Sequence, residues 1–191
     1  MSAPKPLRAD AQRNRDRLVE VAVRAFTENG ADVTLESIAK EAGVGIGTLY
    51  RHFPTREALI EAAYRNELAK LCDSAPELLR TKPADEALRA WLDGFVDYMA
   101  TKHGMGDALK AVIASGVNPF AQSRAKLSEA MTVLQAAAVE AGAIRADTTP
   151  WDVILSASGV CLVYGQVGDR EVANRMLDLL MDGLRYGARR N

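Results

Sequence analysis

The stretch TLESIAKEAGVGIGTLYRHFPTR, residues 34–56, decides the fold of this 191-residue chain. Thr34 is a good N-cap for a short helix over about 35–42, and Gly43 then allows a sharp turn. A second short helix is expected over about 45–52. Helices of this length are marginal in isolation, so the pair predicts a helix-turn-helix that packs against a neighbouring helix.

That neighbour is expected just before the motif, over about residues 10–29. Leu18 and Phe26 belong to its apolar face. Gly30 follows at C′, the position after a helix where glycine tolerates a positive φ. The three helices would form one N-terminal domain over residues 1–55. Its first residues, 1–9, are expected to be a mobile basic arm.

The rest of the chain, residues 56–191, shows the same helical periodicity. Helices are expected near residues 56–73, 84–102, 105–115, 119–141, 150–166 and 170–188. No alternating pattern of apolar and polar residues predicts a strand. We therefore predict an all-α protein of about nine helices, in which a three-helix helix-turn-helix domain precedes a longer helical domain.

The second short helix leaves an unusual set of residues facing outward. Packing explains Leu49 and Phe53, but not the following group: Ile46, Gly47, Thr48, Tyr50, Arg51 and His52. A Tyr-Arg-His cluster can donate hydrogen bonds to phosphates, and the helix start can approach base edges in the major groove. A loose turn with incidental glycines is the alternative.

Charge is distributed unevenly along the chain. The formal net charge is −1, with +2 on residues 1–56 and −3 on the remainder. Arg8, Arg13 and Arg15 cluster at the start of the first helix, where they could reach phosphates or the minor groove. A solvated helix start explains these arginines equally well.

Other classes of protein find little support. Cys72 and Cys161 are far apart, the chain start is polar, and no run of about 18 apolar residues occurs. We expect a soluble cytoplasmic protein with reduced thiols, Cys161 being buried and inert. His52 and His103 are the only imidazoles, and GVGIG lacks the G-x-G-x-x-G spacing. We therefore expect no catalytic residue, metal or cofactor; an all-helical enzyme or lipid carrier is the remote alternative.

Over about 50 residues the N-terminal part closely resembles the DNA-binding domain of TetR-family regulators. The resemblance is carried by Ala25-Phe26, Gly30, Thr34, Ile38-Ala39, Ala42-Gly43-Val44, Gly47-Thr48-Leu49-Tyr50, His52-Phe53 and Arg56-Glu57-Ala58-Leu59. It implies a helical homodimer with one DNA-binding module per subunit. By position, the family pattern assigns phosphate contacts to Tyr50, His52 and Arg56, and an anchoring role to Thr34.

The same resemblance places Ile46, Gly47 and Thr48 against the bases. Relatives often have Ser or Thr where this chain has Gly45, and a polar or basic residue where it has Ile46. We therefore expect recognition through a thymine methyl group, DNA shape and the N-terminal arginines. The full predicted DNA-binding set is Thr34, Gly45, Ile46, Gly47, Thr48, Tyr50, Arg51, His52, Arg56, Arg13 and Arg15.

Aromatic and methionine residues recur on the middle helices. They are Trp91, Phe95, Tyr98, Met99, Met105, Leu109, Phe120, Met131 and Leu134. A helical core explains each of them singly, but as a set they also suit an apolar pocket. Because the resembled family binds ligands in this region, we expect a small hydrophobic effector here.

The last two expected helices carry more apolar residues than one core requires. Pairing them with their two-fold mates would form a four-helix isologous interface. The predicted interface residues are Ile154, Leu155, Ser158, Gly159, Leu162, Leu177, Leu180, Met181 and Leu184. Arg185, Arg189 and Arg190 suit a helix C-terminus and are expected to be structural.

The predicted function is a homodimeric repressor that releases a palindromic operator when it binds its effector. The alternative is a DNA-binding dimer without a small-molecule ligand, which a protein partner or its own abundance controls.

Overall fold

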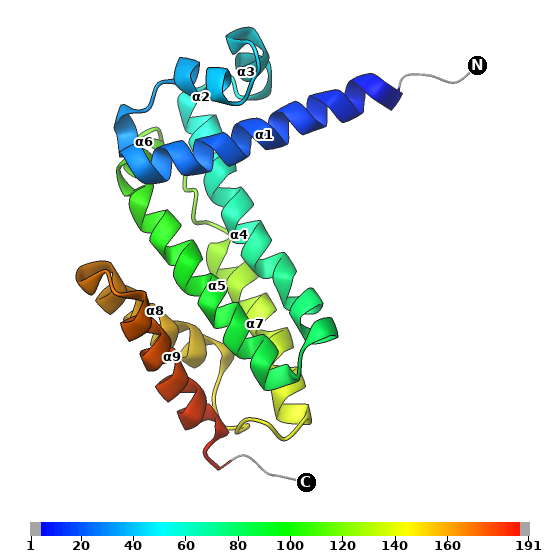
Figure 1. Cartoon of the computed structure of the whole chain (residues 1–191), viewed down its shortest axis with the longest axis vertical. Coiled ribbons are helices and arrows are strands. Elements are labelled where there is room, and N and C mark those ends of the chain that lie inside the picture. The colour runs from blue at the N-terminus through cyan, green and yellow to red at the C-terminus, as the bar shows by residue number, and fades with distance from the viewer. Residues whose placement is uncertain (1–4, 188–191) are drawn as a thin grey trace. The chain divides into compact units, whose positions relative to one another are not determined.

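The structure, a computed structural model, describes residues 5–187, and their side chains from residue 9 onward. Within these limits the chain is all-helical, with nine α-helices, one 3-10 helix (η1) and no strand, which confirms the predicted fold class (Figure 1). The elements are α1 (Lys5–Asn29), η1 (Gly30–Asp32), α2 (Leu35–Glu41), α3 (Ile46–His52), α4 (Arg56–Thr81), α5 (Ala84–Gly104), α6 (Gly106–Ala114), α7 (Ser123–Glu140), α8 (Pro150–Val167) and α9 (Arg170–Arg185).

The helices form two compact units, and both α4 and α5 contribute to each. The first unit contains the described residues through Glu67 together with Thr101–Pro119. The second contains Leu68–Ala100 and the described residues from Phe120 onward. The expected division at residues 55 and 56 coincides with the start of α4, but α4 packs with the first unit as far as Glu67.

In the first unit, α1 supplies the surface on which the short helices pack. Phe26 of α1, Ile38 of α2 and Leu49 of α3 are completely buried. The end of α5 also approaches α1 closely at Gly104. A Cβ atom added there would lie only 2.7 Å from the Thr27 carbonyl oxygen. α6 packs beside η1 in the same unit. Helices of seven residues thus gain their stability from tertiary contacts.

A glycine-dependent turn joins α2 to α3. Gly43 has φ +68°, a conformation that a residue with a Cβ adopts only at a cost. The Gly43 amide donates to Lys40 O at 3.1 Å, and the Val44 amide donates to Ala39 O at 3.0 Å. These two bonds are those of a Schellman motif, which satisfies the last carbonyls of α2 and redirects the chain.

The expected helix over 56–73 was too short, because α4 continues to Thr81 with Pro76 inside it. Proline removes a backbone donor and usually ends or kinks a helix. Here Ala75 is buried beside it, and the Trp91 indole N–H donates to Leu71 O at 2.9 Å. The turn of α4 just before Pro76 is thus held by contacts with the core.

Two other boundaries differ from the expected ones. α1 begins at Lys5, so residues 5–9 of the expected mobile arm are helical, and residues 1–4 lie outside the described residues. α7 begins at Ser123 rather than near residue 119. Turns precede α7, and the Ser123 amide donates to Phe120 O at 3.0 Å.

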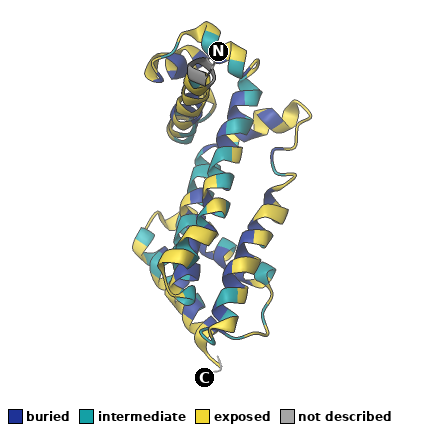
Figure 2. Cartoon of the chain, turned by 90° about the vertical axis from the view of Figure 1, so that its right-hand side faces the viewer, coloured by how far each residue is buried: buried dark blue, intermediate teal, exposed yellow. Residues whose placement is uncertain are grey.

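In the second unit, α8 and α9 lie side by side (Figure 1). α8 begins with the predicted capping box, in which the Asp152 amide donates to Thr149 Oγ1 and the Thr149 amide donates to Asp152 Oδ2. The Thr149 hydroxyl also donates to Asp152 Oδ2, at 2.7 Å, and this bond together with that from the Thr149 amide lowers the pKa of Asp152. Buried residues line the inner faces of the helices in this unit (Figure 2).

Ion pairs join α9 to α5 along their length. Arg185 contacts Asp85 at 2.8 Å, Arg89 contacts Asp178 at 2.9 Å, and Arg170 contacts Asp97 at 2.7 Å. Arg185 thus has a structural role beyond its place at a helix C-terminus, because it bonds the carboxylate of Asp85 on α5. Arg189 and Arg190 lie outside the described residues.

Both cysteines are free thiols. Burial raises the pKa of Cys72 and of Cys161 to about 11. Thiols with such a pKa carry little of the reactive thiolate form near neutral pH.

None of the helices over the described residues is long and apolar enough to cross a lipid bilayer.

Candidate DNA-binding interface

The predicted DNA-binding residues centre on α3, whose two faces differ sharply. Leu49 is completely buried and Phe53, at the C-cap, is 3% exposed. On the opposite face Ile46 is 37% exposed and Tyr50 is 46% exposed. Thr48, Arg51 and His52 also reach the surface, Arg51 fully and the other two in part. The face of α3 that does not pack on α1 thus carries a phenol, a hydroxyl, a guanidinium and an imidazole.

Thr34 caps the start of α2, as predicted. Its Oγ1 accepts a hydrogen bond from the Ser37 amide at 3.1 Å, and Ser37 Oγ donates to Thr34 O at 2.7 Å. Since Oγ1 acts as acceptor within the helix, its own hydrogen can still be donated outward. Ser37 was not among the predicted site residues, although its side chain adds a second hydroxyl group at the start of α2.

Gly45 and Gly47 begin α3. Gly45 is the N-cap residue and, lacking a side chain, makes no side-chain capping bond. A Cβ atom added at Gly47 would meet nothing within 4 Å. Packing inside the protomer therefore does not require glycine at position 47, although glycine inside a helix costs about 1 kcal/mol relative to alanine.

Arg56, the first residue of α4, belongs to the predicted phosphate-binding set. It also has a structural role that sequence reasoning missed. Its guanidinium donates to the carbonyls of Ala31 and Val33, the former at 2.6 Å, and lies 5.0 Å from the centre of the Phe26 ring. Arg56 is half-buried. It thus ties the start of α4 to the segment that leads into α2, and any phosphate contact competes with this role.

The N-terminal arginines lie along α1. Arg15 lies over the Phe53 ring at 5.4 Å, which brings it to the C-terminal end of α3. Arg13 is exposed and paired with Asp10. Arg17 donates to Ala42 O at 3.4 Å, at the end of α2. The Arg8 side chain lies outside the described part of the chain. Of this group, Arg15 lies nearest to α3 by its contacts.

The predicted effector residues are divided between the units. Met105 and Leu109 belong to the first unit, and Trp91, Phe95, Tyr98, Met99, Phe120, Met131 and Leu134 belong to the second. All are buried except Met99 and Phe120, which are half-buried. The rings of Trp91 and Phe95 stack at 5.8 Å. The structure thus uses these residues as core and leaves their role in binding an effector as a prediction.

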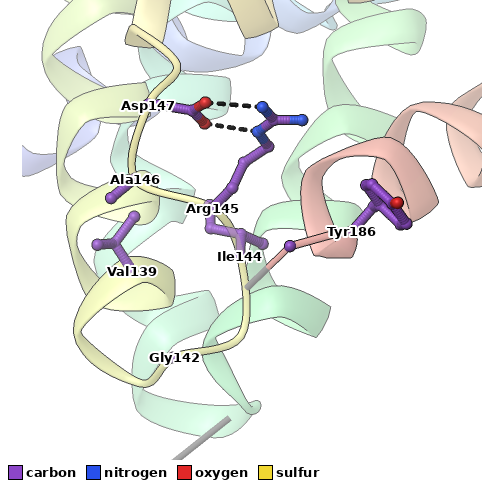
Figure 3. A pocket seen from close by; sticks show the side chains of 8 residues that line it. Val139, Gly142, Ile144, Arg145, Ala146, Asp147 and Tyr186 are labelled. Atoms are coloured by element: carbon purple, nitrogen blue, oxygen red, sulfur yellow. Dashed lines mark hydrogen bonds and ion pairs between the residues drawn. The ribbon is translucent and has the colours of Figure 1, made fainter. Parts of the chain in front are cut away.

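Two surface hollows occur elsewhere. One of about 500 Å³ is lined by Val139, Ile144, Arg145, Asp147 and Tyr186, among others (Figure 3). Figure 3 shows the Arg145 guanidinium paired through two bonds with the Asp147 carboxylate, at 2.5 and 2.7 Å. This pairing lowers the pKa of Asp147. A second hollow of about 480 Å³ is lined by residues of α1, η1 and α2, including Thr34 and Ser37. Neither contains a predicted effector residue.

The predicted dimerisation residues separate into two groups. Ile154, Leu177, Met181 and Leu184 are at most 4% exposed, so they pack inside the protomer and cannot meet a partner directly. The helical periodicity of these residues was predicted correctly, but the face that they form packs into the core of their own protomer. Leu155 and Leu162 are 53% and 71% exposed, and Gly159 is exposed between them on α8. Ser158 and Leu180 are half-buried.

Two further apolar side chains of α8 and α9 are exposed but were not in the predicted dimerisation set. Leu179 of α9 is 71% exposed and Val167, the last residue of α8, is 57% exposed. Large aliphatic side chains with such exposure on neighbouring helices are candidates for contact with a partner.

Comparisons with known proteins agree with this geometry. The family model of bacterial regulatory proteins of the tetR family matches residues 18–63, and that of SbtR-like transcriptional regulator C-terminal domains matches residues 83–186. An HTH-type transcriptional regulator of Staphylococcus aureus strain USA300 is 41% identical over 63 residues, which are 32% of this chain and 34% of that protein. The match thus spans about a third of the curated relative.

Solved structures extend the similarity to nearly the whole chain. The TetR transcriptional regulator SCO0520 from Streptomyces coelicolor is 54% identical, with a TM-score of 0.85, over 90% of this chain and 98% of that one. The TetR regulatory protein from Mycobacterium vanbaalenii is 34% identical, with a TM-score of 0.79, over 94% and 99%. With both halves matched by TetR models and full-length relatives at this identity, the chain belongs to the TetR family of DNA-binding transcriptional regulators.

Proposed function

We propose that this protein is a repressor that binds a palindromic operator through α3 and releases it on binding a small hydrophobic effector. The observation that carries the DNA-binding part is the outward position of Tyr50 beside buried Leu49. Residues 1–55 would form the DNA-binding domain, and residues 56–191 the effector-binding and dimerisation domain. Regulation by a protein partner or by abundance, without a ligand, is the alternative.

In the docked complex, α3 lies in the major groove and its flanks hold the phosphate backbone. The hydroxyl groups of Tyr50 and Thr34 donate to phosphates, and His52 does so when protonated or through its N–H. Ile46 and Thr48 face base edges, and Gly47 lets α3 approach closely. Arg13 and Arg15 extend the positively charged surface along α1.

The dimer is proposed to form through the exposed apolar residues of α8 and α9. Leu155 and Leu162 lie two turns apart on α8, and Leu179 is exposed on neighbouring α9. A two-fold axis would place each patch against its own copy, so that every contact occurs twice. The aliphatic patch favours this interface because its burial removes large apolar area from water.

The effector is proposed to enter among the aromatic and methionine residues of the second unit. Gln135 on α7 offers a buried acceptor in the same unit: it is 5% exposed, its Nε2 donates to Thr148, and its Oε1 has no partner within the described chain. A buried acceptor without a partner costs about 1–3 kcal/mol. A ligand with one donor group on an apolar body would relieve that cost.

The Tyr50→Phe substitution tests the phosphate contact. It removes only the exposed hydroxyl, so we expect operator affinity to fall by about 1.5–3 kcal/mol, to a similar extent on every sequence. Fluorescence anisotropy with operator and unrelated duplexes across a salt series measures this. Tyr186→Phe, which alters another exposed tyrosine, serves as control. Unchanged affinity of the Tyr50 variant at all salt concentrations would place the docking surface elsewhere.

The Gly47→Ala substitution should change stability and DNA affinity in opposite directions. A Cβ there meets nothing in the protomer, so the free protein should gain up to about 1 kcal/mol of unfolding free energy. The same methyl group should obstruct the approach of α3 to DNA and weaken operator binding. Urea unfolding and anisotropy measure the two effects. Gly106→Ala, also in open space, should leave DNA affinity unchanged; equal effects on DNA from both variants would contradict the docking.

The Leu162→Glu substitution tests the dimer interface. The side chain is 71% exposed in the protomer, so the variant should fold, but two charges facing each other across the axis should shift the dimer towards monomer. Sedimentation equilibrium gives the mass, and circular dichroism checks folding. Val133→Glu changes an exposed residue of α7 and should remain dimeric. A fully dimeric Leu162 variant at low concentration would argue for another interface.

A thermal-shift screen with aliphatic and aromatic compounds tests ligand control. A compound at 100 times its Kd should stabilise the protein by about 2.7 kcal/mol, and the true effector should also release operator DNA, since it acts through different affinities for two states. The affinity for operator DNA, measured with and without each hit, tests this release. A protein that binds operator but responds to no compound would favour the alternative control by a partner or abundance.

A further inference from the structure

Arg51 folds back along α3 and bonds two of the residues expected to face bases. Its Nε donates to Gly47 O at 3.2 Å, and its Nη2 donates to Thr48 Oγ1 at 2.9 Å. Residues three apart on a helix share one face, so Arg51 and Thr48 form a continuous polar surface. Arg51 is exposed and Thr48 half-exposed, which leaves this surface open to a ligand.

The two bonds determine which hydrogen-bonding groups remain available. A threonine hydroxyl has one hydrogen and two lone pairs, and Arg51 occupies one lone pair. Among residues 9–187, no protein group accepts the hydrogen of the Thr48 hydroxyl. A guanidinium has five N–H donors, of which two are used here. The pair therefore offers donors outward, next to a positive charge.

Base pairs differ in how well they match such a surface. In the major groove guanine presents two adjacent acceptors, N7 and O6, whereas adenine and cytosine each present an amino donor and thymine presents a single acceptor beside a methyl group. A positively charged donor surface matches guanine and faces an amino donor on adenine or cytosine.

We propose that Arg51 and Thr48 act as one unit that recognises a guanine in each operator half-site. The inference rests on the proposed binding of operator DNA through α3. The Thr48 hydroxyl and a remaining N–H of Arg51 donate to guanine N7 and O6. Arg51 is also a positioning residue for Thr48, because it directs the hydroxyl hydrogen away from the helix. Ile46, by contrast, can contact only apolar groups such as a thymine methyl.

Selection of binding sites from a random duplex library by the dimeric protein tests this pairing. The wild-type protein should enrich one guanine position per half-site. Arg51→Gln and Thr48→Val should both lose preference at that same position and bind the selected site roughly tenfold or more weakly. The double variant should lose little beyond either single variant, because the two side chains act together.

A base analogue identifies the acceptor without altering the protein. Replacing the selected guanine by 7-deazaguanine removes N7 and should weaken wild-type binding several-fold, but should hardly affect the Thr48→Val, Arg51→Gln double variant. Arg65→Gln is the matched charge control, since Arg65 is exposed on α4 and paired with Glu61 at 2.7 Å. It should leave the base preference unchanged. Circular dichroism melting confirms that each variant is folded.

Two results would overturn the inference while DNA binding stands. Uniform weakening by Arg51→Gln with an unchanged base preference would show that Arg51 binds phosphate. Loss of preference at different positions in the two variants would show that they do not act as a unit. If the wild-type protein enriched no sequence at all, the proposed operator binding would fail, and this inference with it.

Discussion

The packing of Leu49 and Phe53 against α1 is the constraint on which the DNA-binding half depends. A seven-residue helix has no stable orientation of its own, so buried side chains must fix its rotation about its axis. With Leu49 completely buried and Phe53 3% exposed, the rotation of α3 leaves Tyr50 46% exposed. The Schellman turn at Gly43 fixes the direction in which α3 leaves α2. Together they determine which side chains can meet DNA.

Local rules explain most of what could be predicted from the sequence. The caps at Thr34 and Thr149 and the turn at Gly43 need only neighbours within a few residues, so their residue types suffice to identify them. The Arg56 bond to Val33 spans 23 residues, and the Trp91 bond to Leu71 of α4 spans 20. No local pattern contains that information, because only the packed fold brings the partners together.

Periodicity also could not separate an interface from a core. Met181 and Leu179 lie two residues apart on α9, yet one is completely buried and the other is 71% exposed. The apolar pattern shows only that both sides of α9 need a partner, since it contains no information on where that partner comes from. The same limit applies to Trp91 and Phe95, whose stacked rings suit a core and a pocket equally.

The use of arginine in the first unit bears on how an effector could act. Arg17 and Arg56 donate to backbone carbonyls and Arg24 pairs with Glu41, so these three side chains have structural roles besides any contact with phosphates. In the proposed dimer, simultaneous contact of the two modules with two half-sites can strengthen binding by a factor of about 100 to 10,000. That gain disappears when the spacing of the modules no longer matches the operator. A small shift in spacing would then suffice for release, without any change in α3 itself.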